Sequence, residues 1–425
     1  MVWPTGMARD RLPAAERRDP AFQKHAITVW RGGVIRPVEV QGAFASPAII
    51  ALACLFIIAY AIEMSGLLGL LIRQATKLCA RLGSVGLWLI LGLCGAASAF
   101  LNNTPIVVLA APVVKDVANA LNLSPKRFLI PLSYVTIMGG ACTLIGTSTN
   151  LLVNDMASNA GQPVFGVFEI TPVGLIVAAA GGLYLFLIGG RLLAQADDGP
   201  TRPRRKLHEQ TGDETLGDPE MFGIENPFDL KRAMISLAVF LAVILAAAAG
   251  VTSIAAGAFA GAVLLILLKI ISPEEAYAGL RPEVLLLIAG MMVVGLAIEV
   301  TGLAAAGTGL PIDVIRPFGP LAALAILYGV TLFATEFLSN AALAVLSTPV
   351  AVALAESLGV APRPFLIAVM IAASAAFATP FGYQTNVLVF QAGHYRYMDF
   401  VRVGVPLNIV SWAVGVAVIP IFFPF

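Results

Sequence analysis

The sequence predicts an all-α polytopic membrane protein with two inverted repeats, re-entrant hairpins and broken transmembrane helices. The first observation behind this prediction is composition, because 59% of the 425 residues are hydrophobic and only 12% are charged. The second is a series of long apolar segments, and the third is a set of motifs that occurs twice in the same order. A soluble fold of this composition would expose large apolar patches, which soluble monomers avoid. This composition therefore excludes a soluble enzyme. The formal net charge of +1 gives no electrostatic footprint for a nucleic acid, which excludes a nucleic-acid binder.

The apolar segments divide the chain into two membrane regions. Residues 1–45 form a polar, Arg-rich tail that lacks the pattern of a signal peptide. The first membrane region (46–191) and the second (232–425) flank a polar linker (192–231). A helix needs about 20 apolar residues to cross a bilayer. The segments that we expect to cross it are 47–72, 126–153 (broken), 171–190, 233–250, 253–271, 283–307, 364–389 (broken) and 403–423, while the stretches 84–120 and 320–357 carry polar residues near their middle.

The second membrane region repeats motifs of the first at a near-constant offset. The matched pairs are 61–66 with 297–302, 100–104 with 337–341, and 149–153 with 385–389. An odd number of expected crossings separates the segment 47–72 from its copy at 283–307, so the two copies should lie upside down relative to each other. Inverted repeats with helices interrupted at matching positions are typical of secondary transporters.

The placement of Lys and Arg predicts the orientation. Most of these residues lie on the side of the membrane that includes the linker 192–231, so we expect that side to be cytoplasmic. The C-terminus should then lie on the opposite, outer side. The membrane itself is expected to be the plasma (inner) membrane. The basic tail would then lie outside, which conflicts with the same rule. Two spans precede the second repeat and none precedes the first. We therefore expect a truncated or misassigned N-terminus, with residues 1–45 disordered or loosely attached.

Two polar motifs, at 100–104 and 337–341, lie in the middle of apolar stretches. Such groups are costly in hydrocarbon unless they are paired or line a water-filled cavity. Helix N-termini at a hairpin tip favour an anion, whereas carbonyl, amide and hydroxyl oxygens suit a hard cation such as sodium. The alternative is that Asn and Thr only bond neighbouring helices. The duplication of the motif favours a binding site.

A second pair of motifs, at 146–150 and 379–386, interrupts two apolar helices with Gly, Pro and small polar residues. Transporters unwind helices in this way near the bilayer midplane, and a simple Gly/Pro kink is the alternative. Glu63 and Glu299 lie near the ends of their apolar segments, and each is either a coupling residue or an acid that is snorkelled or paired. Glu336, whose counterpart is Ala99, is either a site residue or a satisfied buried acid.

The four cysteines and three histidines give no sign of a metal centre or an intramembrane enzyme. The cysteines have no CxxC spacing and are expected to be buried packing residues. All three histidines fall in polar segments, so none is available at membrane depth for catalysis. A channel is also disfavoured, because duplicated closed hairpins do not suggest an open pore. No cofactor is expected apart from the coupling ion.

The paired motifs resemble those of the divalent anion–sodium symporter (DASS) family. Residues 101–105 and 338–341 look like its two Ser-Asn-Thr tips, and the stretch from 379 to 404 is similar to its sulfate-permease-like branch, within the ion transporter superfamily. The resemblance covers about residues 40–190 and 225–425. It implies a homodimer in the lipid bilayer, a scaffold and a moving transport domain, sodium between each tip and the facing broken helix, and a small anion between the tips.

The resemblance also implies individual site residues. One sodium site would draw on Asn102, Asn103, Gly146 and Thr147, and the other on Thr335, Ser339, Asn340, Ala378 and Thr379. The anion would contact Asn103, Thr104, Ser339 and Asn340, with Thr149, Asn150, Thr385 and Asn386 from the broken helices. Asn102 replaces the first Ser of the family motif and Ala341 the second Thr, and these departures leave the substrate open.

The expected function is therefore secondary active transport of a divalent anion, such as sulfate or a dicarboxylate, with sodium coupling and an elevator-like movement. The alternative is a proton-coupled anion carrier or a metalloid exporter of the same superfamily. Sulfate and dicarboxylate cannot be separated on these residues, because both need mainly neutral donors and a positive local potential.

Overall fold

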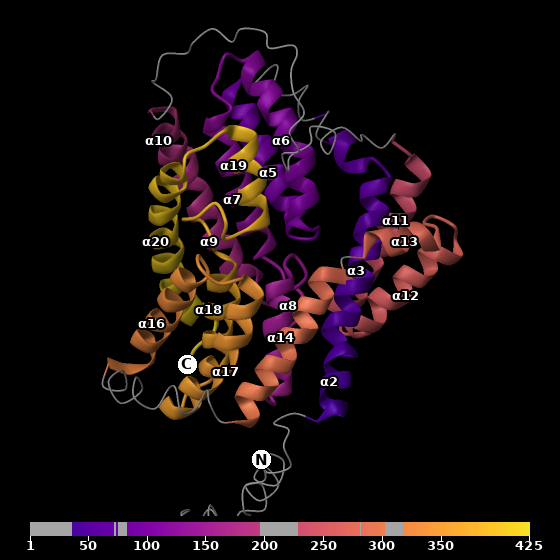
Figure 1. The fold of residues 1–425 in the computed structure, drawn as a ribbon, viewed down its shortest axis with the longest axis vertical. Helices are drawn as coiled ribbons and strands as arrows, with labels where there is room; N and C mark the ends of the chain where they lie inside the picture. Colours follow the sequence, from indigo (N-terminus) through magenta and orange to yellow (C-terminus); the bar gives the residue numbers. More distant parts are fainter. Residues whose placement is uncertain (1–35, 72–73, 75–82, 196–227, 281, 302–317) are drawn as a thin grey trace, which may run out of the picture.

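The computed structural model describes residues 36–71, 74, 83–195, 228–280, 282–301 and 318–425, and its regular structure there is entirely helical (Figure 1). Five of the described helices are long and apolar enough to cross a membrane. The helices of the first part of the chain are α2 (Pro37–Phe44), α3 (Pro47–Met64), α5 (Ser84–Ser98), α6 (Asn103–Ala120), α7 (Lys126–Gly140), α8 (Ser148–Asn159), α9 (Thr171–Tyr184), the π-helical turn η3 (Leu185–Gly189) and α10 (Gly190–Gln195). Those of the second part are α11 (Leu230–Ala248), α12 (Ile254–Leu267), α13 (Pro273–Gly279), α14 (Pro282–Val300), α16 (Gly319–Ala334), α17 (Asn340–Leu358), α18 (Arg363–Ser374), α19 (Gln384–Gly393) and α20 (Tyr397–Phe422).

Each apolar segment that the sequence marks as a crossing contains a helix, and the two segments expected to be broken are broken. The first divides into α7 and α8, and the second into α18 and α19. The two stretches with polar centres form the helix pairs α5–α6 and α16–α17, each with its polar motif at the turn. In Figure 1 the pair α5–α6 lies in the upper half of the molecule and the pair α16–α17 in the lower half.

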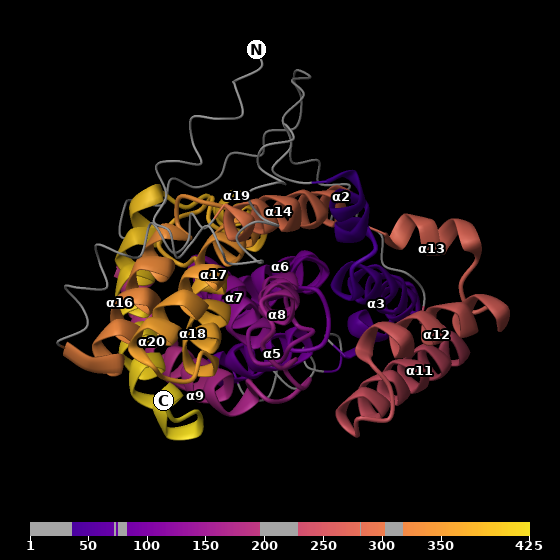
Figure 2. The ribbon, with the colours of Figure 1, turned by 90° about the horizontal axis from the view of Figure 1, so that it is seen from below.

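The helices pack into two bodies. The smaller body joins α11, α12, α13 and much of α3 around buried side chains such as Ile58, Phe240 and Leu265. The larger body contains both helix pairs, both broken helices, α9 and α20, and its core includes the fully buried Tyr134 and Phe365. Figure 2 shows α11, α12 and α13 standing to one side, with α3 between them and the larger body. The outer faces of α11 and α12 expose large apolar side chains, as lipid-facing helices do.

Two short helices each pack against a helix from the other half of the chain. α2 packs against α14, and α13 packs against α3. Both begin at a proline, Pro37 and Pro273, whose fixed φ suits the first turn of a helix. Residues 37–44 therefore differ from the expected loosely attached tail, because Ala43 of α2 is buried in the main core. Residues 1–35, the rest of the expected tail, lie outside the described residues.

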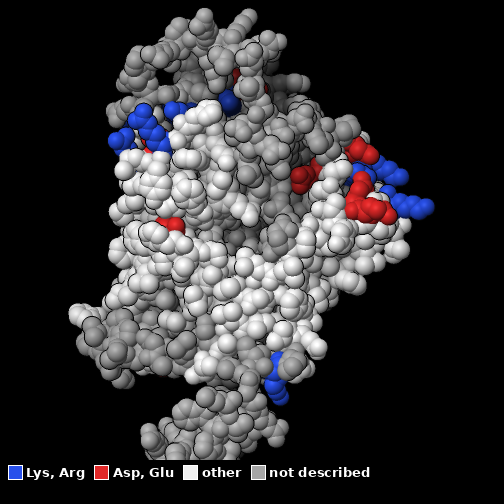
Figure 3. Space-filling view, in the orientation of Figure 1, with Lys and Arg blue, Asp and Glu red and all other residues white. Residues whose placement is uncertain are grey.

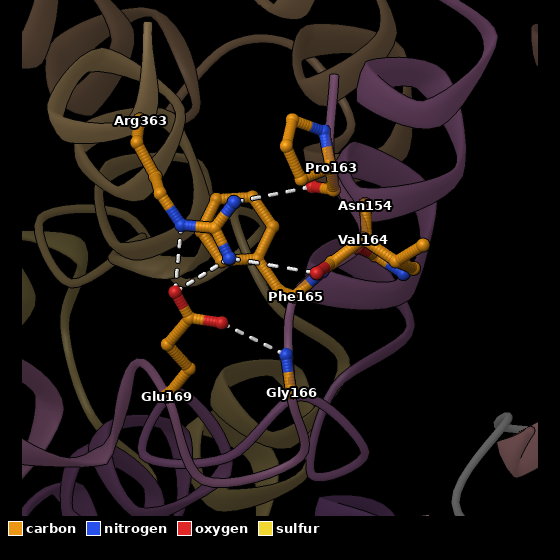
Figure 4. A network of polar contacts seen from close by, with 7 residues as sticks. All are labelled: Asn154, Pro163, Val164, Phe165, Gly166, Glu169 and Arg363. Atoms are coloured by element: carbon orange, nitrogen blue, oxygen red, sulfur yellow. Dashed lines mark hydrogen bonds and ion pairs between the residues drawn. The ribbon is translucent and has the colours of Figure 1, made fainter. Parts of the chain in front are cut away.

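Arg363, at the start of α18, holds the loop between α8 and α9 (Figure 4). Its Nε donates to Glu169 Oε1 over 2.6 Å, and its terminal nitrogens donate to the carbonyl oxygens of Pro163 and Val164. The guanidinium also lies 4.2 Å from the ring centroid of Phe165. A planar fork with five N–H groups can make all these contacts at once, which a lysine cannot.

Charged side chains are unevenly distributed over the face of the molecule that Figure 3 shows. In Figure 3 most Lys and Arg side chains lie at the upper end of the molecule and over the smaller body, while the face below is almost free of charge. Such a distribution fits a helical protein whose middle is surrounded by lipid.

Candidate functional site

A cavity of about 420 Å³ lies where the two polar turns and the two helix breaks meet. One side is closed by α3 and α14, through Leu52, Leu55, Phe56, Ala59, Leu287 and Ile288. The polar side consists of four short segments that lie far apart in the sequence, which are Phe100 with 102–104, 145–149, 336–341 and 381–384. The structure therefore brings both pairs of duplicated motifs to one place.

Four of the described helices begin at this cavity. They are α6, α8, α17 and α19, and the first residue of each lines it. The first N–H groups of a helix have no partner within the helix and carry the positive end of its dipole. The lining contains no Lys or Arg among the described residues. The positive ends of the four helix dipoles are therefore the cationic character that the described lining offers, beside the carboxylate of Glu336.

Side chains at the helix starts cap some of these N–H groups. Asn102 Oδ1 accepts from Thr104 N over 3.1 Å, and Ser339 Oγ accepts from Ala342 N over 3.2 Å. Thr147 Oγ1 lies 3.4 Å from Thr149 N. Asn102, Thr147 and Ser339 were predicted site residues, and all three line the cavity. Each cap satisfies one backbone N–H group of a first turn that opens at the cavity.

Each of the two polar turns contains a hydroxyl–amide contact, and the two contacts occupy matching positions in the repeat. Ser98 Oγ donates to Asn103 Oδ1 over 2.5 Å, and Thr335 Oγ1 lies 2.8 Å from Asn340 Oδ1. Thr335 also lies 2.8 Å from the carbonyl oxygen of Ala373. Each hydroxyl fixes the amide that opens the following helix, so the sequence duplication extends to the contacts.

The two helix breaks are also matched. Asn150 Nδ2 donates to the Thr143 carbonyl over 2.8 Å, and Asn386 Nδ2 donates to the Thr379 carbonyl over 3.1 Å. The Thr143 hydroxyl in turn accepts from Gly146 N, as the Thr379 hydroxyl accepts from Gly382 N, both over 3.1 Å. These bonds satisfy groups that the interrupted helices leave free.

Some predicted site residues lie behind the cavity rather than in its lining. Asn150, Thr385 and Asn386 are fully buried or nearly so, and Ser133 Oγ lies within 2.8 Å of the side-chain oxygens of both Thr385 and Asn386. Thr335, Ala378 and Thr379 are likewise buried outside the lining. The predicted residues that do line the cavity are Asn102, Asn103, Thr104, Gly146, Thr147, Thr149, Ser339 and Asn340.

Two residues of the cavity, Tyr383 and Gln384, were not among the predicted site residues. Asn103 Nδ2 donates to the Tyr383 hydroxyl over 3.0 Å, and Thr104 Oγ1 donates to Gln384 Oε1 over 3.2 Å. The second break is therefore bonded directly to the first turn. The repeat could not reveal these residues, because the first copy has the much smaller Thr147 and Ser148 at their positions.

Glu336 is surrounded by donors. Its Oε1 accepts from Phe377 N, Ala378 N and Asn408 Nδ2, and its Oε2 accepts from Thr379 N and lies 2.9 Å from the Thr379 hydroxyl. All five distances lie between 2.7 and 2.9 Å, and the residue is 7% exposed. Of the two readings that the sequence left open, the contacts are those of a satisfied buried acid, although the residue also borders the cavity.

The first turn and the first break approach each other through two glycines. A Cβ on Gly140 would lie 2.8 Å from Asn103 Oδ1 and 3.1 Å from the Gly146 carbonyl oxygen. A Cβ on Gly146 would lie 2.8 Å from the Ala99 carbonyl oxygen and closer still to that of Gly140. Four oxygens and the amide nitrogen of Asn103 therefore lie around this glycine pair. Two of the oxygens, Asn103 Oδ1 and the Ala99 carbonyl, already accept from the hydroxyls of Ser98 and Thr143.

The remaining glutamates and the cysteines that the sequence analysis singled out do not line this cavity among the described residues. Glu63 borders a smaller neighbouring cavity of about 140 Å³ between α3, α13 and the first turn, and the side chain of Glu299 lies outside the described residues. Cys54, Cys94 and Cys142 are buried, as predicted, and Cys79 is not described. Among the described residues no three His, Cys, Asp or Glu side chains gather as they would around a metal.

The fold is shared with a membrane transporter of known structure. The crystal structure of the YdaH transporter of Alcanivorax borkumensis superposes with a TM-score of 0.61 at 13% identity, covering 95% of this chain and 89% of that one. At this identity the likeness concerns the fold alone.

The chain belongs to the citrate transporter family (CitMHS), whose model matches residues 25–360. The model of the sodium:sulfate symporter transmembrane region matches residues 313–424. Among relatives, the transporter sll0640 of Synechocystis is 24% identical over 89% of each chain. The sodium-dependent dicarboxylate transporter SdcS of Staphylococcus saprophyticus is 26% identical over 92% of this chain and 80% of its own. These matches agree with the resemblance to divalent anion–sodium symporters, and the protein is an integral membrane protein.

Proposed function

We propose that the chain is a secondary active transporter that carries a divalent anion, such as sulfate or a dicarboxylate, together with sodium. The convergence of four helix N-termini on the central cavity is the observation that carries this proposal. Such termini attract anions without a cationic side chain, because their N–H groups and dipoles point at the ligand. Asn103, Thr104, Ser339 and Asn340 would hold the anion between the two turns.

Sodium coupling rests on the oxygens around Gly140 and Gly146. Asn103 and Gly146 are both residues of the expected first sodium site, and Asn103 Oδ1 and the Gly146 carbonyl oxygen both lie near Gly140. The matched families and relatives include a sodium:sulfate symporter region and a sodium-dependent dicarboxylate transporter, which makes sodium the first cation to test.

The movement that we propose is a displacement of the larger body against the smaller one. The cavity lies where they meet, because Leu55 of the smaller body lines it opposite the turns and breaks of the larger one. α14 lies beside α3 at the cavity and packs through Ile288 into the larger core. The upper and lower positions of the two helix pairs in Figure 1 support inverted repeats of residues 46–191 and 232–425, which would open the cavity to each side in turn. We also propose a homodimer with the linker 192–231 in the cytoplasm and the C-terminus outside.

The experiment is uptake of labelled sulfate, succinate and citrate into proteoliposomes, each with and without an inward sodium gradient. We expect one of these anions to accumulate above its outside concentration only when sodium is present. Sodium-independent accumulation that follows a pH gradient would favour the proton-coupled carrier. No accumulation of any anion, together with export of arsenite, would favour the metalloid exporter.

A further inference from the structure

The start of α19 is held differently from the starts of the other three helices that open at the cavity. Asn102, Thr147 and Ser339 cap α6, α8 and α17 with their own side chains, whereas the N-cap residue of α19 makes no such bond. We propose that Ser133 of α7 is a positioning residue for the anion site, which fixes the start of α19 from the first half of the chain. This inference rests on the proposed function and assigns a role to a residue outside the cavity lining.

Asn386, near the start of α19, joins this helix to the unwound segment before it. Its Nδ2 donates to the carbonyl oxygens of Ala376 over 2.8 Å and of Thr379 over 3.1 Å. Both amide protons are thereby used, so the side-chain oxygen of Asn386 remains as an acceptor that needs a donor. Ser133 supplies this donor, with 2.7 Å between its Oγ and Asn386 Oδ1.

The direction of the neighbouring hydrogen bond follows from the number of protons. Ser133 has one hydroxyl proton, and Asn386 Oδ1 can only accept it. The Thr385 hydroxyl, 2.8 Å from Ser133 Oγ, must therefore donate to Ser133. All three side chains are fully buried, so a lost bond leaves a buried polar group without its partner. One serine of α7 thus holds two successive residues of α19.

The two residues that precede this pair reach the anion site. Tyr383 and Gln384 bond to Asn103 and Thr104 of the α5–α6 turn. α19 packs against both α6 and α7, beside which it lies in Figure 1. Its first residues are therefore bonded to the α5–α6 turn on the cavity side and to Ser133 behind it. A shift of the helix start would move the Tyr383 hydroxyl and the Gln384 amide away from their partners.

The first break shows the same arrangement without a serine. Asn150 takes the place of Asn386 there, but its side-chain oxygen is buried and has no hydrogen-bond partner among the described residues. The position that matches Ser133 in the repeat falls on Val369 or Met370, and neither side chain can donate. The native chain thus folds with one such orphaned oxygen. Ser133→Ala, which creates the same situation at Asn386, should therefore fold as well.

Uptake kinetics in proteoliposomes, with KM and Vmax measured separately, test this role. Ser133→Ala should raise the KM for the transported anion about fivefold and leave Vmax nearly unchanged, because the loss of one hydrogen bond shifts the site and not the surfaces between the two bodies. Thr385→Val removes the partner hydroxyl at nearly equal size and should also raise the KM. Ser411→Ala is the matched control, since Ser411 is buried and lies 3.0 Å from the Tyr328 hydroxyl of α16, with no bond to α19 among those of the described residues. Its KM should stay at the wild-type value.

A combined variant separates positioning from a general weakening of the fold. In a chain that already carries Tyr383→Phe and Gln384→Ala, the added Ser133→Ala should change the KM less than about twofold, because the contacts that it positions are gone. A further rise of about fivefold in this background would show that the effects add independently, and it would overturn the inference.

Hydrogen–deuterium exchange of the purified full chain gives a readout that does not depend on transport. Ser133→Ala should speed amide exchange at residues 384–390 and leave residues 148–154, their counterparts after the first break, at the wild-type rate. Unchanged exchange at 384–390, or a wild-type KM in both single variants when they elute as monodisperse protein, would overturn the inference. If the wild-type chain carries none of the three anions, the proposed function fails, and the exchange result decides on Ser133 alone.

Discussion

Arg363 and Glu169 join the second half of the chain to the first, with 2.6 Å between Nε and Oε1. Both side chains are partly exposed, so the ion pair alone is worth little. The same guanidinium also bonds to two carbonyl oxygens and covers the Phe165 ring, and these contacts need its planar shape.

Arg363→Lys should therefore lower the free energy of unfolding by about 1 kcal/mol, because lysine keeps the charge and loses the fork and the ring contact. Thermal unfolding in detergent would show a lower melting temperature. Arg402→Lys, at an exposed arginine of α20, is the matched control and should leave the melting temperature unchanged. Equal shifts in both variants would contradict a specific role for Arg363.

Asn103→Ala and Asn340→Ala should each abolish anion uptake and leave the fold largely intact. Both residues open a helix at the cavity, and each accepts a hydrogen bond from a hydroxyl of its own turn. A polar group lost from a ligand shell inside the membrane is not replaced cheaply. The measurement is uptake into proteoliposomes, with Asn119→Ala, at the exposed end of α6, as control. Uptake at the wild-type level in either folded variant would refute the site assignment.

Tyr383→Phe tests the bond between the second break and the first turn. The change removes the hydroxyl that accepts from Asn103 Nδ2 and keeps the ring. A hydrogen bond of this kind is worth about 1 kcal/mol, so we expect the KM for the anion to rise about fivefold. Tyr277→Phe, at an exposed tyrosine of α13, is the control. An unchanged KM would mean that Asn103 is positioned by Ser98 alone.

Glu336→Gln should reduce stability and preserve the sodium dependence of uptake. An amide at this position can still accept at one oxygen, but its NH₂ group would face a donor such as Thr379 N, at a cost of about 1–3 kcal/mol. The measurements are melting temperature and the sodium dependence of uptake, with Glu356→Gln at an exposed site of α17 as control. Uptake that follows a pH gradient without sodium, and that disappears in this variant, would instead assign proton coupling to Glu336.

The helices and the two pairs of motifs could be predicted from the sequence, because long apolar segments indicate the helices and repetition indicates the motifs. The length of the apolar segments predicted the membrane spans, and the duplication predicted that residues 100–104 and 337–341 belong to the binding site. Tyr383 and Gln384 left no such signal, since their copies differ in size and chemistry. The donors around Glu336 could not be foreseen either, because they depend on where α18 ends, and helix ends are set by tertiary contacts as much as by local sequence.

The hydrogen bonds between the two halves also set an order of events during synthesis. The amide of Asn103 and the hydroxyl of Tyr134 find their partners in Tyr383 and the Phe377 carbonyl, which the ribosome adds more than 240 residues later. At bacterial or eukaryotic elongation rates that interval is on the order of tens of seconds. Throughout it, the nascent first half sits in the translocon or the bilayer with polar groups that only the second half can satisfy. Chains released early should therefore be recognised by membrane quality control, and a pulse-chase comparison of truncated and full-length chains would measure their lifetimes.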